Sequence, residues 1–253
     1  MNFKPGDYVT RKSHNNDVIF KIIKISDNNA YLKGVYDRLY ADALIEDLIE
    51  SKENEDSFKY ESICNRSTNE YFYLPGKILH IDGDSEYLEK CLRFYKANQI
   101  YAIGKKLTES EIAVQIKELL EKYKPEIVVI TGHDAYYSKK ATSDEEKYQN
   151  SVNFIKAVKQ ARDYEKSHDK LIIIAGACQS DYENLIKAGA NFASSPKRIN
   201  IHALDPAIVA SSIALTKNSE DIDLVNILNK TKYGSDGIGG IITRGVMYVG
   251  FPR

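Results

Sequence analysis

The sequence contains few cysteines, no long apolar run and no excess of either charge. Its three cysteines are odd in number and far apart, which argues against a disulfide framework and against a metal-binding spacing: Cys64, Cys91 and Cys178. We therefore expect a reducing, cytoplasmic compartment in which free thiols persist, and the sequence implies neither a metal nor a cofactor. No apolar run approaches the roughly 18 residues of a membrane span, and the opening MNFKPGDYV lacks the regions of a signal peptide. We thus expect no membrane insertion.

The charge balance narrows the choice of partners. The 253 residues include 35 Lys and Arg against 36 Asp and Glu, a formal net charge of −1. Such a chain gives no electrostatic reason to expect nucleic acid or an anionic membrane as its main partner. A hydrophobic content of 43% is that of an ordinary globular protein, and the length suits a small domain joined to a larger one.

The first fifty residues have the pattern of a small β domain. Short β-prone runs are separated by the turn clusters SHNND and SDNN, and VIFKIIKI is apolar at nearly every other residue. We expect a short acidic helix and four strands: Leu44–Ile49, and Tyr8–Arg11, Val18–Ile25, Ala30–Lys33 and Arg38–Ala41. This pattern predicts an SH3-like barrel over residues 1–50, a module that docks more often than it catalyses. Residues 51–75 have the charged, aperiodic composition of a linker.

From residue 76 to residue 253, apolar strands alternate with amphipathic helices. The expected strands are Ile78–Ile81, Ile100–Ile103, Ile127–Ile130 and Leu171–Ala175, with shorter ones at Phe192–Ser194 and Ile199–His202. The expected helices span residues 85–96, 109–123, 145–165, 181–188, 206–215 and 220–229, and capping boxes begin two of them, Thr108 with Glu111 and Ser143 with Glu146. The glycine-rich end adds one or two strands. We predict an α/β domain with a mostly parallel sheet covered by helices on both faces.

Residues capable of catalysis follow three of these strands. Asp82, Gly83 and Asp84 follow the first, Gly132, His133 and Asp134 follow the third, and Cys178 follows the fourth. Open parallel sheets bind ligands at the carboxyl ends of their strands, so we expect these side chains at one edge. A thiol, an imidazole and backbone N–H groups there support nucleophilic acyl transfer. Cys178 also precedes a helix, whose dipole favours the thiolate.

Each of these residues also has a purely structural interpretation. A cysteine after a strand is commonly buried packing, and a histidine in a loop is commonly a surface residue, but their coincidence at one sheet edge favours a Cys–His pair. The residues DGDS can simply form a turn and cap the following helix. His80 is expected inside the sheet, His202 is a weaker alternative to His133, and neither Cys64 nor Cys91 competes as a nucleophile.

Two blocks of the sequence, EIVVITGHDAYYS and KLIIIAGACQSDYENLIKAGANFASSP, resemble the YabG family of sporulation-specific proteases. The opening FKPGDYVTRKSHNNDVIFKIIKI and the stretch LKGVYDRLYADALIEDL share the resemblance, which covers essentially the whole chain. It implies a cysteine endopeptidase of endospore-forming bacteria that processes spore coat and related proteins and cuts after arginine. It also implies a location in the mother-cell cytoplasm with association to the spore coat. Cys178 is then the nucleophile and His133 the general acid and base, with Asp134 beside it.

The chain also resembles caspases, gingipains and legumains, which place a histidine after one apolar strand and a cysteine after the next. The resemblance implies a caspase-like arrangement of the sheet. In those enzymes a glycine commonly follows the histidine and supplies an oxyanion N–H. Here Asp134 follows the histidine and Gly132 precedes it. The backbone N–H groups of Cys178, Asp134 and Gly132 are the expected oxyanion donors.

The same likeness implies where an arginine side chain would bind. In arginine-cutting members of the wider class, an acidic residue near the end of the first strand can hold the guanidinium, whose fork matches a carboxylate. We expect Asp82 or Asp84 to do so, with Asp84 favoured as helix cap and Asp82 as pocket. Asp181 and Asp205 are further candidates. A protease that cuts after arginine would also cleave itself at Arg66 in the linker.

Three other classes of function stay open. The stretch ILHIDGDSEY loosely resembles the aspartate pair of haloacid-dehalogenase-like phosphatases, but Glu86 stands where they have threonine, and that chemistry needs magnesium and no Cys178. A non-catalytic scaffold would bind a coat component through the N-terminal barrel and would tolerate the replacement of Cys178 by alanine. A glutaminase-like amidotransferase shares the strand–cysteine arrangement but acts on a free amide.

Overall fold

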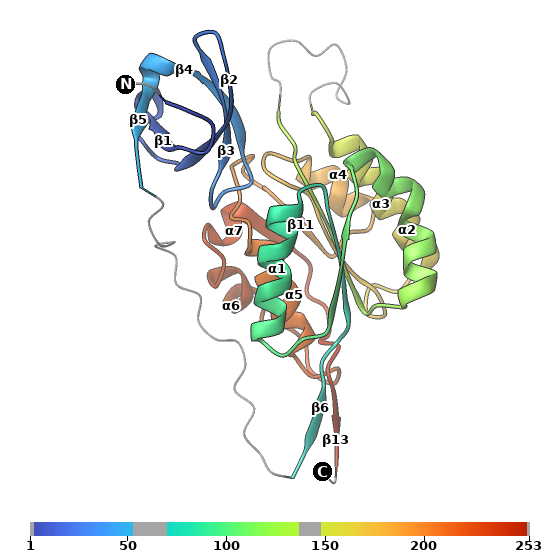
Figure 1. Cartoon of the computed structure of the whole chain (residues 1–253). Coiled ribbons are helices and arrows are strands. Elements are labelled where there is room, and N and C mark those ends of the chain that lie inside the picture. Colours follow the sequence, from blue (N-terminus) through green and yellow to red (C-terminus); the bar gives the residue numbers. More distant parts are fainter. Residues whose placement is uncertain (1–2, 53–69, 137–147, 252–253) are drawn as a thin grey trace. The chain divides into compact units, whose positions relative to one another are not determined.

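The computed structural model describes residues 3–52, 70–136 and 148–251, and the chain divides into two compact units, Met1–Lys59 and Tyr60–Arg253 (Figure 1). The predicted linker at residues 51–75 lies mostly outside the described residues. The same holds for Cys64, for Arg66 and for the expected capping box of Ser143 and Glu146.

The first unit is a sheet of five antiparallel strands in the order β4-β3-β2-β1-β5. The strands are β1 (Tyr8–Arg11), β2 (Phe20–Ser26), β3 (Asn29–Gly34), β4 (Tyr40–Leu44) and β5 (Leu48–Glu50), with 3₁₀ turns at Lys12–His14 and Ile45–Asp47. Phe20 and Ile22 are buried while Lys21 between them is exposed, so β2 places one face on the core, as its alternating sequence predicts.

Two expectations for the first unit are not met. The helix expected at Leu44–Ile49 is wrong, because Leu48–Glu50 pairs with β1 as strand β5 and only a 3₁₀ turn precedes it. Pairing along the sheet outweighs the helical tendency of so short a segment. The SH3-like barrel is not confirmed, because β4 and β5 lie at opposite ends of the strand order and the sheet is not closed.

The second unit contains a six-stranded sheet in the order β12-β11-β10-β9-β7-β8, parallel except for β12. Its strands are β7 (Ile78–Asp82), β8 (Ala102–Lys106), β9 (Ile127–Thr131), β10 (Ile172–Ala175), β11 (Phe192–Ser194) and β12 (Ile238–Gly240). Its helices are α1 (Ser85–Ala97), α2 (Glu109–Tyr123), α3 (Ser151–Tyr164), α4 (Tyr182–Lys187), α5 (Asp205–Ala214), α6 (Leu224–Asn229) and α7 (Gly234–Gly237). The predicted α/β architecture, a largely parallel sheet flanked by helices, is confirmed.

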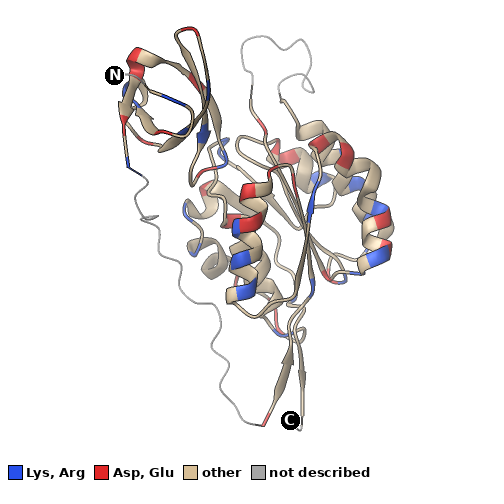
Figure 2. Ribbon diagram, in the orientation of Figure 1, with Lys and Arg blue, Asp and Glu red and all other residues tan. Residues whose placement is uncertain are grey.

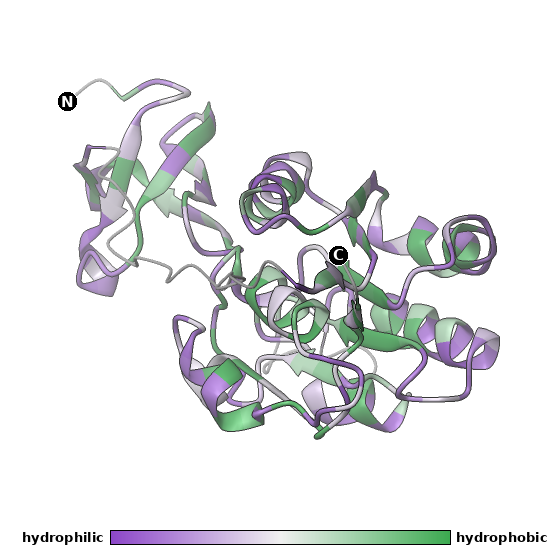
Figure 3. Cartoon of the chain, turned by 90° about the horizontal axis from the view of Figure 1, so that it is seen from below, coloured by the Kyte–Doolittle hydropathy of each residue, from purple (hydrophilic) through white to green (hydrophobic). Residues whose placement is uncertain are grey.

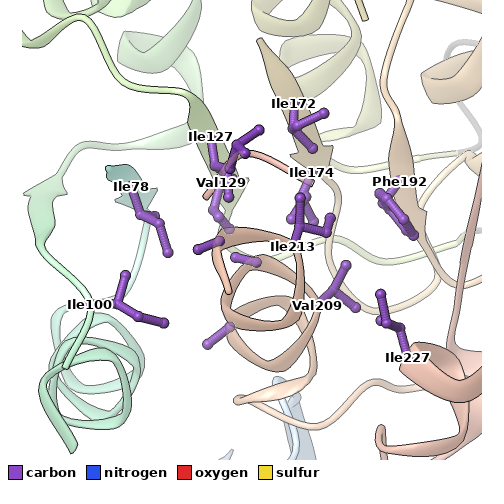
Figure 4. Close-up of a cluster of buried hydrophobic side chains, with 14 of the residues drawn as sticks. Ile78, Ile100, Ile127, Val129, Ile172, Ile174, Phe192, Val209, Ile213 and Ile227 are labelled. Carbon is purple, nitrogen blue, oxygen red and sulfur yellow. The ribbon is translucent and has the colours of Figure 1, made fainter. Parts of the chain in front are cut away.

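Helices cover both faces of this sheet, and each face has its own hydrophobic layer. α1, α5 and α6 pack on one face, where Ile78, Val129 and Ile213 are fully buried (Figure 4). α2, α3 and α4 pack on the other face, where Leu79 and Val128 are fully buried. Because successive strand residues enter opposite layers, the strands are apolar at every position. Figure 3 shows the hydrophobic strands inside, and Figure 2 shows both signs of charge along the helices.

A separate two-stranded ribbon joins the two ends of this unit. β6 (Phe72–Leu74) pairs antiparallel with β13 (Tyr248–Gly250), as Figure 1 shows. The rings of Tyr71 and Phe251, at the end of the ribbon, have centroids 5.4 Å apart. The glycine-rich end of the sequence thus supplies two strands, β12 and β13.

Most predicted bounds in the second unit lie close to the observed ones, and the larger differences have local causes. The strand expected at Ile100–Ile103 begins at Ala102, because the N–H of Ile100 bonds to Tyr95 and completes the end of α1. The helix expected at 145–165 is observed from Ser151 onward. Ile199–His202 form no strand, because this segment bonds to the turn around Cys178 instead. Within the described ranges, the helices are too short or too polar to act as membrane spans.

Arg162 fastens α3 to the sheet. Its buried guanidinium donates to the amide oxygen of Asn191 and to four backbone carbonyls, at 2.8 to 3.1 Å. The carbonyls are those of Glu165, Ser167, Leu171 and Gly189. One side chain therefore supplies hydrogen-bond donors to five oxygen atoms around the ends of α3 and β10.

We expect Arg162→Leu to lower the free energy of unfolding by about 3 kcal/mol, because several buried carbonyls lose their donor. Urea denaturation followed by circular dichroism measures this change. Arg93→Leu is the matched control, since Arg93 only pairs with Glu89 on the exposed surface of α1. Equal stability of the two variants would contradict the structural role of Arg162.

Candidate active site

The loops that follow β9 and β10 lie side by side. The two strands are parallel neighbours, with Ile130 opposite Ala175, and the N–H of Gly176 continues the pairing by donating to Ile130 at 3.0 Å. His133 comes two residues after the end of β9 and Cys178 three residues after the end of β10. The sheet therefore brings the backbones of these two residues to one edge.

Cys178 lies in a tight, buried turn. Its side chain is 1% exposed, and its sulfur accepts a hydrogen bond from the N–H of Ile201 at 3.2 Å. The thiol also lies 3.9 Å from the carbonyl oxygen of the same residue. Gly176 has a φ of 104° and Gln179 has a φ of 56°, so left-handed residues lie on both sides of the cysteine. A non-glycine residue in this conformation is held by its surroundings, and such positions gather at functional sites.

His133 is held on its backbone and on its ring. Its N–H donates to Oε1 of Glu109 at 2.8 Å, and its carbonyl accepts from the amide of Asn150 at 2.9 Å. Its ring nitrogen Nε2 lies 3.2 Å from Oδ2 of Asp84, and the Tyr87 ring packs with its centroid 5.8 Å away. The imidazole is 20% exposed, so it lies at the surface of this edge in a fixed orientation.

Asp134 joins three loops instead of contacting the imidazole. Its carboxylate accepts from the N–H groups of Ala135 (2.9 Å) and Asn150 (2.7 Å) and from the hydroxyl groups of Ser151 and Ser180, the latter at 2.9 Å. Burial raises the pKa of Asp134, and the hydrogen bonds from these four donors oppose that shift. None of the described hydrogen bonds of this carboxylate goes to the ring of His133.

Asp82 belongs to a hydrogen-bonded network inside the sheet. Its side chain is fully buried, Oδ1 accepts from the N–H of Asp84 at 2.9 Å, and Oδ2 accepts from the hydroxyl of Thr131 at 2.9 Å. His80 lies 3.5 Å from the same carboxylate and bonds through Nδ1 to the hydroxyl of Tyr95 at 2.9 Å. Asp82, which the sequence favoured as the arginine-binding residue, is thus not accessible to solvent in this structure.

Asp84 and Asp181 both cap helices. Oδ1 of Asp84 accepts from the first N–H groups of α1, which confirms the predicted capping role. Asp181 accepts through both oxygens from Asn184 in the first turn of α4. Asp181 also lines a cavity of about 420 Å³, together with Lys156, Lys159 and Lys187. Three lysines around one carboxylate would repel the guanidinium of a bound arginine.

The other candidates have structural roles. Cys91 is buried on α1, where its thiol donates to the carbonyl of Ala203 at 3.4 Å. His202 accepts through Nδ1 from the N–H of Leu204, and its own N–H donates to Asp205 before α5. Cys178 therefore remains the candidate nucleophile at the sheet edge, and His133 remains the candidate general acid and base.

Comparison with known proteins shows which family the chain belongs to. A family model described as YabG peptidase U57 matches residues 4–66 and 49–252. The chain belongs to this family. One curated relative, the sporulation-specific protease YabG of Bacillus subtilis (strain 168), is 41% identical over 286 residues, which cover 100% of this chain and 99% of the relative. The resemblance found in the sequence is confirmed, and membership of the YabG family identifies the chain as a peptidase.

Glu109 is a residue of the candidate site of this YabG-family chain that the sequence did not reveal. It is the first residue of α2, directly after the capping residue Thr108, and its carboxylate reaches His133 across the end of β9. A Cβ atom on Gly83 or on Gly132 would lie 2.3 to 2.4 Å from its Oε1. Two glycines at the ends of β7 and β9 therefore make room for this one carboxylate, a link that spacing along the chain cannot predict.

Two backbone N–H groups of the candidate site of this YabG-family chain already donate hydrogen bonds within the protein. The N–H of Ala177 donates to Ser180 at 2.9 Å, and the N–H of His133 donates to Glu109. Neither group is therefore directed at a substrate oxygen in this structure. The amides of Cys178, Asp134 and Gly132 stay the predicted oxyanion donors.

We expect Asp134→Asn to lower the free energy of unfolding by about 2 kcal/mol, because an amide NH₂ cannot accept from Ser151 or Ser180. Thermal and urea denaturation measure the loss. Asp169→Asn changes an exposed carboxylate to the same amide and should leave stability unchanged. If the two variants are equally stable, Asp134 does not hold these loops together.

Proposed function

We propose that this YabG-family chain is a sporulation-specific cysteine endopeptidase, with Cys178 as the nucleophile and His133 as the general acid and base. The observation that carries the proposal is the placement of these two residues just beyond the ends of neighbouring parallel strands. The curated relative's description as a sporulation-specific protease supports the biological setting. Its substrates are then proteins, and spore coat and related proteins are the class implied by the resemblance.

Cys178, His133 and one water molecule account for every bond and proton in the proposed reaction. His133 takes the proton of the Cys178 thiol, and the thiolate forms a bond to the scissile carbonyl carbon while backbone N–H groups hold the oxyanion. His133 then gives its proton to the leaving amine as the carbon–nitrogen bond breaks. Water attacks the resulting thioester, loses a proton to His133, and releases the acid product and the thiol. Because Cys178 is 1% exposed, substrate binding must shift the residues around the thiol.

Cleavage after arginine is the specificity we propose, with Glu109 as the acidic residue that pairs with the guanidinium. The neighbouring carboxylates have both oxygens in hydrogen bonds: Asp82, Asp84, Asp134 and Asp181. Among the described residues, Glu109 uses only Oε1, and it is partly exposed. A carboxylate held by one oxygen and open at the other can bind a basic side chain without first losing a partner.

The remaining parts of the proposal concern the setting of the reaction. We place the enzyme in the mother-cell cytoplasm, in association with the spore coat, with the first unit as a docking module for coat proteins. Self-cleavage after Arg66 would separate the two units, and mass spectrometry of wild type beside Cys178→Ala tests it. Equal intactness of both proteins after long incubation would remove this part of the proposal.

We expect the wild-type protein to cleave a short arginine-containing peptide and Cys178→Ala to be at least about 1,000-fold slower, because the nucleophile is lost. Iodoacetamide should abolish the wild-type activity. Cys91→Ala removes a buried cysteine of α1 and serves as the matched control, which should keep its activity.

The outcomes separate the proposed peptidase from a binding protein. Equal cleavage by wild type and Cys178→Ala would refute Cys178 as the nucleophile. The buried thiol is the observation that favours a non-catalytic scaffold. That alternative gains support if a spore-coat protein binds wild type and Cys178→Ala equally and is cut by neither. The phosphatase alternative needs magnesium and makes no use of Cys178, so an activity that iodoacetamide leaves intact would favour it.

We expect Glu109→Gln to lower kcat/KM for an arginine peptide about 10- to 100-fold, because the amide keeps the bond to the His133 N–H but loses the charge. The matched substrate carries citrulline, a neutral analogue of arginine, and both enzymes should cleave it at similar rates. Glu109→Ala should slow both substrates, since the backbone of His133 then loses its acceptor. An unchanged arginine-to-citrulline ratio in Glu109→Gln would exclude Glu109 as the specificity residue.

A further inference from the structure

We infer that Asp84, and not Asp134, is the positioning residue that orients the imidazole of His133 and sets its protonation. This inference rests on the proposed Cys178–His133 chemistry and assigns a group that the sequence alone placed elsewhere. Oδ2 of Asp84 lies 3.2 Å from Nε2 of His133, whereas the described hydrogen bonds of Asp134 all go to other groups. The two side chains are 6% and 20% exposed, so bulk water screens their interaction only in part.

The carboxylate of Asp84 is itself fixed from two sides. Oδ1 accepts from the N–H groups of Glu86 at 2.9 Å and Tyr87 at 3.2 Å, which begin α1. Its own backbone N–H donates to Asp82. The N-terminal end of α1, with its positive partial charge, thus lies against the carboxylate that contacts the imidazole. A partner that is rigid before substrate binds adds little reorganisation to the reaction.

Behind Asp84 the hydrogen bonds continue into the core. Asp82 accepts from Thr131 on β9, Thr131 also lies 3.0 Å from Nε2 of His80, and His80 bonds to Tyr95 on α1. All four side chains are buried. The chain of contacts joins the ends of β7 and β9 to α1, so the position of Asp84 is determined by the sheet and by the helix together.

The contact with Asp84 determines which ring nitrogen serves in catalysis. A carboxylate at Nε2 favours the tautomer with the proton on Nε2, which gives Nδ1 the lone pair that accepts the thiol proton. The described contacts of His133 include Asp84 before α1 and the Tyr87 ring on α1 at the imidazole, and Glu109 of α2 at the backbone N–H. Of these, Asp84 is the charged group at the ring, so it stabilises the imidazolium that pairs with the thiolate.

Asp84→Asn tests this inference because asparagine also caps helices well and has nearly the same size. We expect kcat/KM for the arginine peptide to fall roughly 10- to 1,000-fold with little change in KM, as expected when a carboxylate behind a catalytic imidazole is lost. The alkaline limb of the pH profile should move to lower pH, because the imidazolium loses its negative partner. Asp84→Ser also keeps a capping side chain but cannot reach His133, and it should show the same defects.

A second measurement does not depend on peptide cleavage. The rate of alkylation of Cys178 by iodoacetamide, followed against pH, reports the thiolate that His133 stabilises. In Asp84→Asn the pH profile of alkylation should move to lower pH, as the pH profile of the activity does. Wild-type pH profiles in both variants would overturn the inference and leave Asp84 as a helix cap alone. If wild type cleaves no peptide, the proposed function fails, while the alkylation profiles still decide whether Asp84 acts on the Cys178–His133 pair.

Discussion

The burial of the Asp82 carboxylate, with the hydrogen bonds described for it, is the constraint on which the rest of the site depends. A fully buried carboxylate without donors would cost several kcal/mol, so the residues that supply those donors have little freedom. One donor is the backbone of Asp84 and the other is the hydroxyl of Thr131 on the neighbouring strand. The ends of β7 and β9 are thereby held in one register. The helix cap, the contact to His133 and the position of its backbone follow from that register.

Burial and hydrogen bonding assign different tasks to chemically similar side chains at this edge. Asp82 is fully buried and fastens two strands, while Asp134 gathers four donors and fastens three loops. Asp84 divides its two oxygens between a helix and an imidazole. Glu109 has one engaged oxygen and one that is not in a described hydrogen bond. The number of carboxylate oxygens left without a described donor, more than the presence of negative charge, separates structural carboxylates from those able to bind a substrate.

The sequence predicts the fold of the second unit well because its signals are local. Buried parallel strands are apolar at every position, and Thr108 with Glu111 begins α2 at the predicted residue. Cys178 and His133 could be placed at one sheet edge because strand ends are readable. Contacts across the edge were not predictable, because Glu109 meets His133 only through the strand order β9-β7-β8 and not through any spacing along the chain. The roles of Asp82, Asp84 and Asp134 also depend on contacts across the sheet edge, which the sequence does not reveal.

The ribbon of β6 and β13 has a consequence for how this unit tolerates changes of connectivity. The pairing of Phe72–Leu74 with Tyr248–Gly250 places the first and last described strands of the unit next to each other. Ends that lie together can be joined by a short peptide, and new ends can be opened in a surface loop elsewhere. The second unit is therefore a good subject for circular permutation. Trimming the chain after residue 246, by contrast, would remove β13 and leave the backbone N–H and C=O groups of β6 without their partners.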